Sequence, residues 1–242
     1  MSAACPAYFA TPLDQALFAA AETLIQPPSG EPLPPLANGR FRYVLACNGL
    51  FVQTRTAALE ASLPLAALPD GLPYGSARIG VRCRREPPSP SLWREPKRRA
   101  VAACPGEWTA YLLHDGANYQ VFEPSIRSQD GGHIAYQPLP AALQAHLVLH
   151  VHSHGFGEAA FSVQDDAADA TGGDGVYFAV VFGRCETQET VTEVWRLIVW
   201  RWSWPFSASH PFDQVMSLAQ SDADAMLSVS MTAETAHGLT DS

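Results

Sequence analysis

Hydrophobic and polar positions along the chain alternate in short runs that proline-rich breaks separate. The run FRYVLACNGLFVQT (41–54) predicts two strands around an Asn48-Gly49 turn, and residues 77–83 predict a further strand. The breaks QPPSGEPLPP (26–35) and EPPSP (86–90) cannot lie inside a helix or a central strand. We therefore expect a small β-rich N-terminal module, residues 1–88, that ends at the second break.

The pattern changes after the second break. The sequence predicts helices and strands in alternation, with helices over 91–103 and 162–170 and strands over 107–115, 118–125, 147–154, 176–183 and 191–202. Because the two kinds of element are interleaved, residues 89–242 are expected to form an α/β or α+β domain around a mixed sheet flanked by helices. A further helix is expected over 212–227, in a tail that follows Pro205.

Composition narrows the class of protein. Of the 242 residues, 47% are hydrophobic and 16% charged, which is enough apolar material for a sizeable core. No apolar run approaches the roughly 18 residues of a membrane helix, and the N-terminus lacks a basic segment followed by an apolar one. The five cysteines include no C-x-x-C pair. We expect a cytoplasmic protein without membrane contact, whose cysteines are reduced and mostly buried.

Charge is unevenly distributed between the two halves of the chain. Residues 1–100 hold 11 Arg or Lys against 7 Asp or Glu, whereas residues 101–242 hold 4 against 17. The basic residues concentrate between Arg78 and Arg99. A stretch of this kind can face nucleic acid or an acidic partner, but a solvated helix face is the commoner explanation.

The candidate chemistry lies in the run HSHGFGEAAFSVQD at 152–165. Side chains alternate along a strand, so His152 and His154 project from one face and can present two imidazole nitrogens to one ion. A helix that starts near Ser162 would place Asp165 on its first turn as a third ligand. Two histidines, a carboxylate and an open position form the ligand set of a catalytic zinc. Taken singly, the pieces are also typical of two ordinary histidines and of a helix capping box.

The complete spacing H-x-H-x(7)-S-x(2)-D resembles the signature of the JAMM (JAB or MPN-plus) metalloprotease family. The resemblance implies a cytidine-deaminase-like, three-layer fold, a Zn²⁺ ion, and a glutamate near the start of an upstream strand. Glu107 in PGEWTAYLL stands in that position, whereas Glu95 falls inside a predicted helix and Glu123 near Pro124 at the end of the next strand. By resemblance, Glu107 would be the general base and Ser162 would stabilise the oxyanion. The alternative for Glu107 is a surface carboxylate at a strand end.

A closer resemblance is to the PRTRC system protein A group, plasmid-associated JAMM-domain proteins. It rests on HSHGFGEAAFSVQDDAAD and covers roughly residues 90–204. It implies other PRTRC system proteins as partners, including a ThiF-like adenylating protein and a ParB-like nuclease. Most JAMM proteins have proline where this chain has Gly155, and glycine there is expected to loosen the loop over the metal.

Three neighbours of the motif have open roles. If alternation persists, His150 shares a strand face with His152 and is a further ligand or, more commonly, a buried supporting histidine. Asp166 and Asp169 would either orient the ligands or lie on a solvated acidic helix. The expected function is zinc-dependent hydrolysis of a peptide or isopeptide bond in a protein substrate. The alternatives are a non-enzymatic JAMM-fold scaffold subunit and a nucleic-acid-associated plasmid maintenance factor that uses the Arg78–Arg99 stretch.

Overall fold

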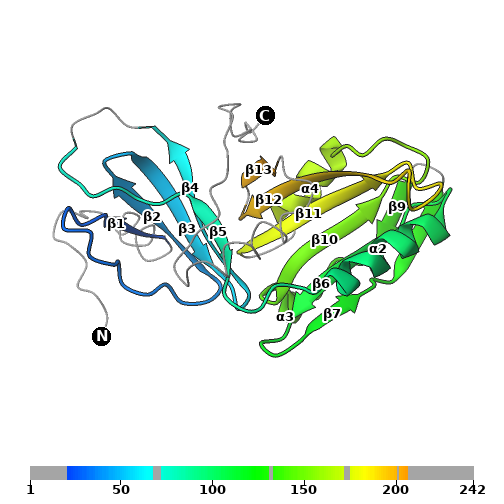
Figure 1. The fold of residues 1–242 in the computed structure, drawn as a ribbon, viewed down its shortest axis with the longest axis horizontal. Coiled ribbons are helices and arrows are strands. Elements are labelled where there is room, and N and C mark those ends of the chain that lie inside the picture. Colours follow the sequence, from blue (N-terminus) through cyan, green and yellow to red (C-terminus); the bar gives the residue numbers. More distant parts are fainter. Residues whose placement is uncertain (1–20, 68–71, 131–132, 172–174, 201, 207–242) are drawn as a thin grey trace.

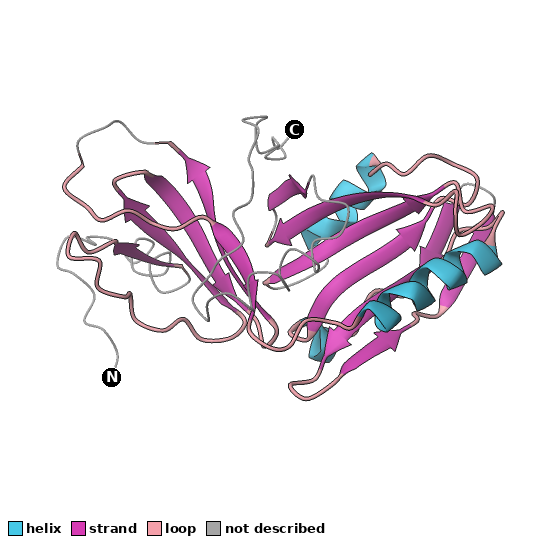
Figure 2. Cartoon of the chain, viewed as in Figure 1, coloured by secondary structure: helices cyan, strands magenta, loops and turns pink. Residues whose placement is uncertain are grey.

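The computed structural model describes residues 21–67, 72–130, 133–171, 175–200 and 202–206. Within these ranges the chain forms a five-stranded sheet, a six-stranded sheet and a separate two-stranded hairpin. Figure 1 shows the N-terminal sheet beside the larger sheet, with α2 (Pro90–Ala103) along the larger sheet. Strands dominate the described chain, as Figure 2 shows. The architecture is therefore mixed α and β, as the alternation of predicted elements indicated.

The N-terminal sheet has the order β1-β2-β3-β4-β5. Its strands are β1 (Glu22–Ile25), β2 (Arg40–Ala46), β3 (Gly49–Arg55), β4 (Leu59–Ala66) and β5 (Gly80–Cys83). The predicted β2-β3 hairpin is confirmed, but its two turn residues are Cys47 and Asn48, because Gly49 already pairs with Ala46. Both hydrogen bonds of the Asn48 amide go to the backbone of Ala77, at 2.8 and 2.9 Å. Asn48 therefore ties the hairpin to the segment before β5.

The larger sheet has the order β13-β12-β11-β10-β6-β7. Its strands are β6 (Thr109–His114), β7 (Tyr119–Phe122), β10 (Leu147–Ser153), β11 (Val176–Gly183), β12 (Thr192–Val199) and β13 (Trp202–Phe206). Only the pairing of β10 with β11 is parallel within this sheet, so the sheet is mixed. Between β7 and β10 lie the hairpin of β8 (Ile126–Asp130) and β9 (His133–Tyr136) and the short helix α3 (Ala141–Gln144). Helix α4 (Val163–Thr171) joins β10 to β11.

Alternation along β11 and β12 separates the two faces of the larger sheet. Phe178, Val180 and Phe182 point to one apolar cluster, which also contains Trp93 of α2 and Leu59 and Leu63 of β4. The other face carries a smaller cluster that includes Tyr111, Tyr177 and Ile198. The first face is thus covered by α2 and the N-terminal sheet together. The second is left for α4 and for the segment between β7 and β10.

The two sheets share this first core. Phe41 of β2 packs against Trp200 with ring centroids 4.2 Å apart, and a Cβ on Gly175 would lie 2.7 Å from the Thr56 side chain. A division of the chain at residues 88 and 89 remains a prediction. No described helix is long and apolar enough to cross a membrane. The predicted helix over 212–227 lies outside the described residues.

Candidate metal centre

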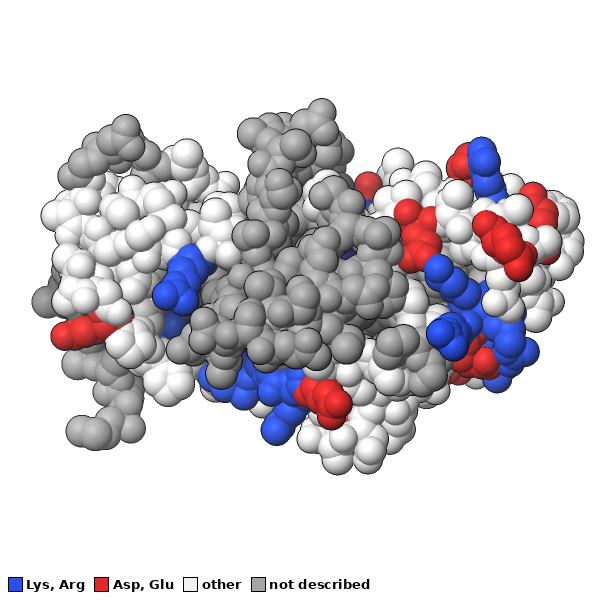
Figure 3. Space-filling model, viewed as in Figure 1, with Lys and Arg blue, Asp and Glu red and all other residues white. Residues whose placement is uncertain are grey.

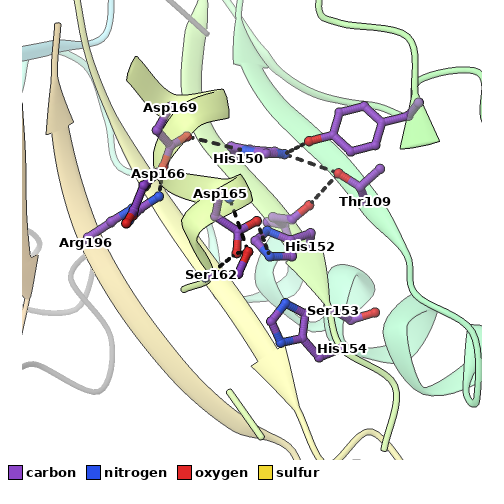
Figure 4. A network of polar contacts seen from close by, with 12 residues as sticks. Thr109, His150, His152, Ser153, His154, Ser162, Asp165, Asp166, Asp169 and Arg196 are labelled. Carbon is purple, nitrogen blue, oxygen red and sulfur yellow. Dashed lines mark hydrogen bonds and ion pairs between the residues drawn. The ribbon is translucent and has the colours of Figure 1, made fainter. Parts of the chain in front are cut away.

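Strand β10 carries His152 toward the second face of the larger sheet. The strand is buried throughout, and it alternates between the two faces: Val151 belongs to the first core, while His150 and His152 face α4. His154 follows the strand end, and its ring centroid lies 5.1 Å from that of His152. Figure 4 shows these side chains with Asp165, which projects from the first turn of α4.

The donor atoms of His152, His154 and Asp165 all lie within 4.8 Å of one another. The Nε2 atom of His152 is buried and forms no aligned hydrogen bond with any described residue, although Asp165 Oδ1 lies 3.1 Å from it. Burial lowers the pKa of the His152 imidazole and favours its neutral form. A buried imidazole nitrogen that faces a carboxylate oxygen without an aligned proton is an arrangement that a cation would complete. The three residues therefore fit a zinc ion.

Asp165 is held in place by Ser162. The Ser162 backbone N–H and hydroxyl both donate to Asp165 Oδ2, at 2.6 and 2.7 Å, and the Asp165 N–H donates to Ser162 Oγ at 3.2 Å. This is the capping box that the Ser-x-x-Asp spacing also indicated. Burial alone would raise the pKa of the Asp165 carboxyl, but His152 and Ser162 hold it well below its usual value. Asp165 is accordingly a carboxylate, the form that binds metal.

Glu107 is buried, with an exposed fraction of 9%, and lines the same cavity as the three metal-binding candidates. The alternative of a surface carboxylate is therefore wrong. Two contacts that the sequence did not suggest fix the peptide group between Glu107 and Trp108. Gln129 of β8 donates to the Glu107 carbonyl at 2.5 Å, and the buried Ser153 hydroxyl accepts from the Trp108 N–H at 2.9 Å. Ser153 lies inside the H-x-H-containing strand, but the sequence contains no signal for Gln129.

Gly155 lies in the loop that follows the histidines and packs closely against Pro105. Its φ is +54°, in the left-handed region. Proline cannot adopt this φ, because its ring fixes φ near −65°. A Cβ at Gly155 would lie 2.2 Å from the Pro105 carbonyl oxygen. The Gly155 carbonyl also accepts from the Cys185 N–H at 2.8 Å. The looser loop stays a prediction, but glycine here allows the backbone to pack against the segment that carries Glu107.

We predict that Gly155→Ala lowers the free energy of unfolding by about 3 kcal/mol or more, because it adds a backbone clash to the cost of a left-handed alanine. Gly30→Ala is the matched control, since Gly30 also has a positive φ of +74° but open space around its Cβ position. Its loss should be about 1 to 2 kcal/mol. Denaturant titration of both variants measures the difference. Equal losses would mean that the Pro105 carbonyl moves aside without cost.

His150 is not among the three metal-binding candidates. Its Nε2 lies 3.2 Å from the Tyr136 hydroxyl and 3.3 Å from Thr109 Oγ1, and its Nδ1 lies 3.9 Å from Asp169 (Figure 4). His150 thus occupies the buried supporting position that the sequence left open as one of two roles. The Tyr136 hydroxyl belongs to β9 and the Thr109 hydroxyl to β6. His150 therefore ties the β8-β9 hairpin to the larger sheet.

Asp166 and Asp169 bind Arg196 of β12. Both oxygens of the buried Asp169 carboxylate are engaged, one by the Tyr177 hydroxyl at 2.8 Å and the other by Arg196 Nε at 2.9 Å. Arg196 also pairs with the more exposed Asp166 and stacks over the Phe161 ring, 3.8 Å from its centroid. Neither aspartate contacts His152 or His154 in the described structure, so they fasten α4 to the sheet instead of orienting ligands directly.

Four of the eight basic residues from Arg78 to Arg99 are paired with carboxylates. Arg82 pairs with Glu60, Arg98 and Arg99 pair with Glu95, and Lys97 pairs with Glu193. On the face drawn in Figure 3, acidic side chains adjoin the basic ones on the right and at the lower edge, whereas one basic group toward the left has no acidic neighbour in this view. This favours a solvated helix face over a continuous phosphate-binding patch.

One cavity of about 750 Å³ contains the whole candidate site. Glu107, Ser162 and the three metal-binding candidates line it together with His150, Asp169 and several tyrosines. Every site residue that the sequence singled out for chemistry is therefore brought to one place. A pocket of this size accommodates a ligand well beyond a water molecule.

Comparison with known proteins bears on the N-terminal sheet alone. A family model described as a domain of unknown function (DUF2016) is similar to residues 11–84, a segment that ends before α2. No curated protein matches the chain. The chain is thus similar to DUF2016 over the N-terminal sheet, in the part of the sequence that the motif does not reach.

Proposed function

We propose that this protein is a JAMM-type zinc hydrolase that cleaves a peptide or isopeptide bond in a protein substrate. The observation that carries the proposal is the convergence of His152, His154 and Asp165 to within 4.8 Å in a cavity that Glu107 also lines. A structural zinc is normally closed by four protein ligands, whereas three leave a position for water or substrate. The finer assignment of the larger sheet as a cytidine-deaminase-like JAMM domain belongs to the same proposal.

Each residue then has a distinct task. When bound, zinc would supply Lewis-acid chemistry that polarises the scissile carbonyl and makes water acidic enough to react near neutral pH. Glu107 accepts the proton of the attacking water and passes it to the leaving amine. Ser162 donates its hydroxyl hydrogen bond to the developing oxyanion. Because that proton is directed to Asp165 in this structure, the hydroxyl must turn toward the substrate for this step.

The substrate that we propose is a protein tail joined through an amide bond, in a conjugate that depends on a ThiF-like adenylating partner. The resemblance to the PRTRC system protein A group supports this choice and the proposal that the protein acts in a plasmid-associated system. A nucleic-acid function has weaker support, because four of the basic residues between Arg78 and Arg99 are paired with carboxylates.

Metal analysis of the purified full chain tests the proposal. We expect about one zinc per chain, lost in His152→Ala and His154→Ala and weakened in Asp165→Asn. His146→Ala is the matched control, because the His146 imidazole bonds to the His114 carbonyl and lies outside the residues that line the cavity. Full zinc content in the double variant of His152 and His154 would show that the ligands lie elsewhere. Zinc binding without cleavage of any peptide or isopeptide would favour the scaffold subunit.

A further inference from the structure

The cavity is larger than the metal-binding group requires. The part farther from that group has a mainly apolar and aromatic lining. Besides the metal-binding candidates, it is lined by what we name the aromatic end, namely Tyr111, Tyr136, Leu139 and Leu147. Tyr111, Leu139 and Leu147 belong to the apolar cluster on the second face of the sheet, and Tyr136 packs against it. The aromatic end is therefore a preformed apolar wall beside the site of the proposed chemistry.

His150 connects the two parts of the cavity. Its ring stacks on Tyr111 with centroids 4.7 Å apart and an interplanar angle of 20°, and it lies 6.0 Å from the Tyr136 ring. On the other side, its centroid is 5.7 Å from that of His152. His150 and His152 are neighbours on one face of β10. The aromatic end, which contacts His150, therefore lies next to the metal-binding group along this strand.

The buried polar groups near the aromatic end are already satisfied by one another. Asp169 binds Tyr177 and Arg196, and His150 Nε2 contacts the hydroxyls of Tyr136 and Thr109. Arg127 also lines the cavity, but it is exposed on β8. A charged group placed against this wall would lose its hydration without gaining a buried partner. An uncharged apolar group would be stabilised by burial.

We infer that the aromatic end is a specificity subsite for a bulky uncharged side chain, aromatic or branched aliphatic, on the substrate residue next to the scissile amide. This inference rests on the proposed function and deepens it, because it names the residue class that the site selects. Glycine at that position would leave the subsite unfilled. Discrimination against glycine should be at least about tenfold, since hydrophobic pockets separate side chains that differ by one methylene by roughly 10- to 200-fold.

Direct binding tests the subsite without requiring hydrolysis. The dissociation constants of N-acetylphenylalaninamide, N-acetylleucinamide and N-acetylglycinamide are measured by ligand-observed NMR on the zinc-loaded full chain. We expect the first two to bind at least about tenfold more tightly than the third. In Ala135→Phe, whose new ring would occupy the cavity that Ala135 lines, the difference should fall below about threefold. Ala117→Phe, in the exposed turn between β6 and β7, is the matched control and should keep the preference.

The outcomes separate this inference from the proposed hydrolase. Equal binding of the three amides to zinc-loaded protein overturns the subsite and leaves the hydrolase proposal intact. A preference that Ala135→Phe and Ala117→Phe both retain also overturns it, because the bulky group then binds elsewhere. A preference that only Ala135→Phe removes supports the subsite, even if no peptide is cleaved.

Discussion

Glu107→Gln is expected to abolish most hydrolysis while the protein keeps its zinc and its fold. The substitution is nearly isosteric but removes the group that accepts the proton of the attacking water. General-base catalysis commonly contributes a factor of about 10² to 10⁴, so kcat against a peptide or isopeptide substrate should fall by that much. Gln129 and Ser153 hold the backbone around Glu107 rather than its carboxylate, so the loop should keep its position. Metal analysis and kinetics on the same preparation measure both quantities.

Glu123→Gln provides the matched control. Glu123 follows β7, outside the cavity, and its carboxylate pairs with the exposed Arg99. Removal of one negative charge there should leave kcat within about twofold, because exposed ion pairs contribute little. If both variants lose activity equally, the effect is one of overall charge. If Glu107→Gln retains full activity with zinc bound, Glu107 is not the base and another proton acceptor must be sought.

Local patterns in the sequence predicted most of the candidate site. The H-x-H spacing placed two imidazoles on one face because strand alternation is a local property, and the Ser-x-x-Asp spacing placed Asp165 at a helix start for the same reason. The structure confirms the strand and the helix and brings the donor atoms together. Glu107 required the family resemblance, since it lies 45 residues before His152 and reaches the cavity through the pairing of β6 with β10.

Contacts between distant segments could not be predicted in this way. Gln129 reaches Glu107 from a hairpin whose short strands lack clear alternation, and Arg196 looks like a polar interruption of an apolar strand. The role of Gly155 depends on the Pro105 carbonyl, 50 residues earlier in the chain, so the exchange of the family's proline for glycine suggested looseness where the structure shows close packing. The N-terminal strands followed their hydrophobic pattern, but nothing in that pattern indicated that β4 would share a core with α2.

Arg196→Met is expected to cause the largest loss of stability, about 3 to 5 kcal/mol at neutral pH. The Arg196 and Asp169 side chains are 7% and 9% exposed, so the variant would leave a buried carboxylate without its cation. Burial would raise the pKa of Asp169, but His150 and Arg196 hold it below its usual value. The carboxylate therefore stabilises the fold at neutral pH, and this contribution is lost as pH falls through the folded-state pKa. The gap between wild type and Arg196→Met should accordingly narrow in acid.

Two further variants distinguish a buried charge from lost packing. In Arg196→Met/Asp169→Asn the amide carries no charge, and part of the stability lost in Arg196→Met should return, because the penalty comes mainly from the unpaired carboxylate. Arg184→Met removes an arginine from an exposed pair with Glu158 and should cost little or nothing. Chemical denaturation at neutral and acidic pH measures all three variants. If the double variant is no more stable than Arg196→Met at neutral pH, removal of the unpaired charge has made no difference. The stability lost in Arg196→Met then comes from the stacking of Arg196 on Phe161 and from packing around β12.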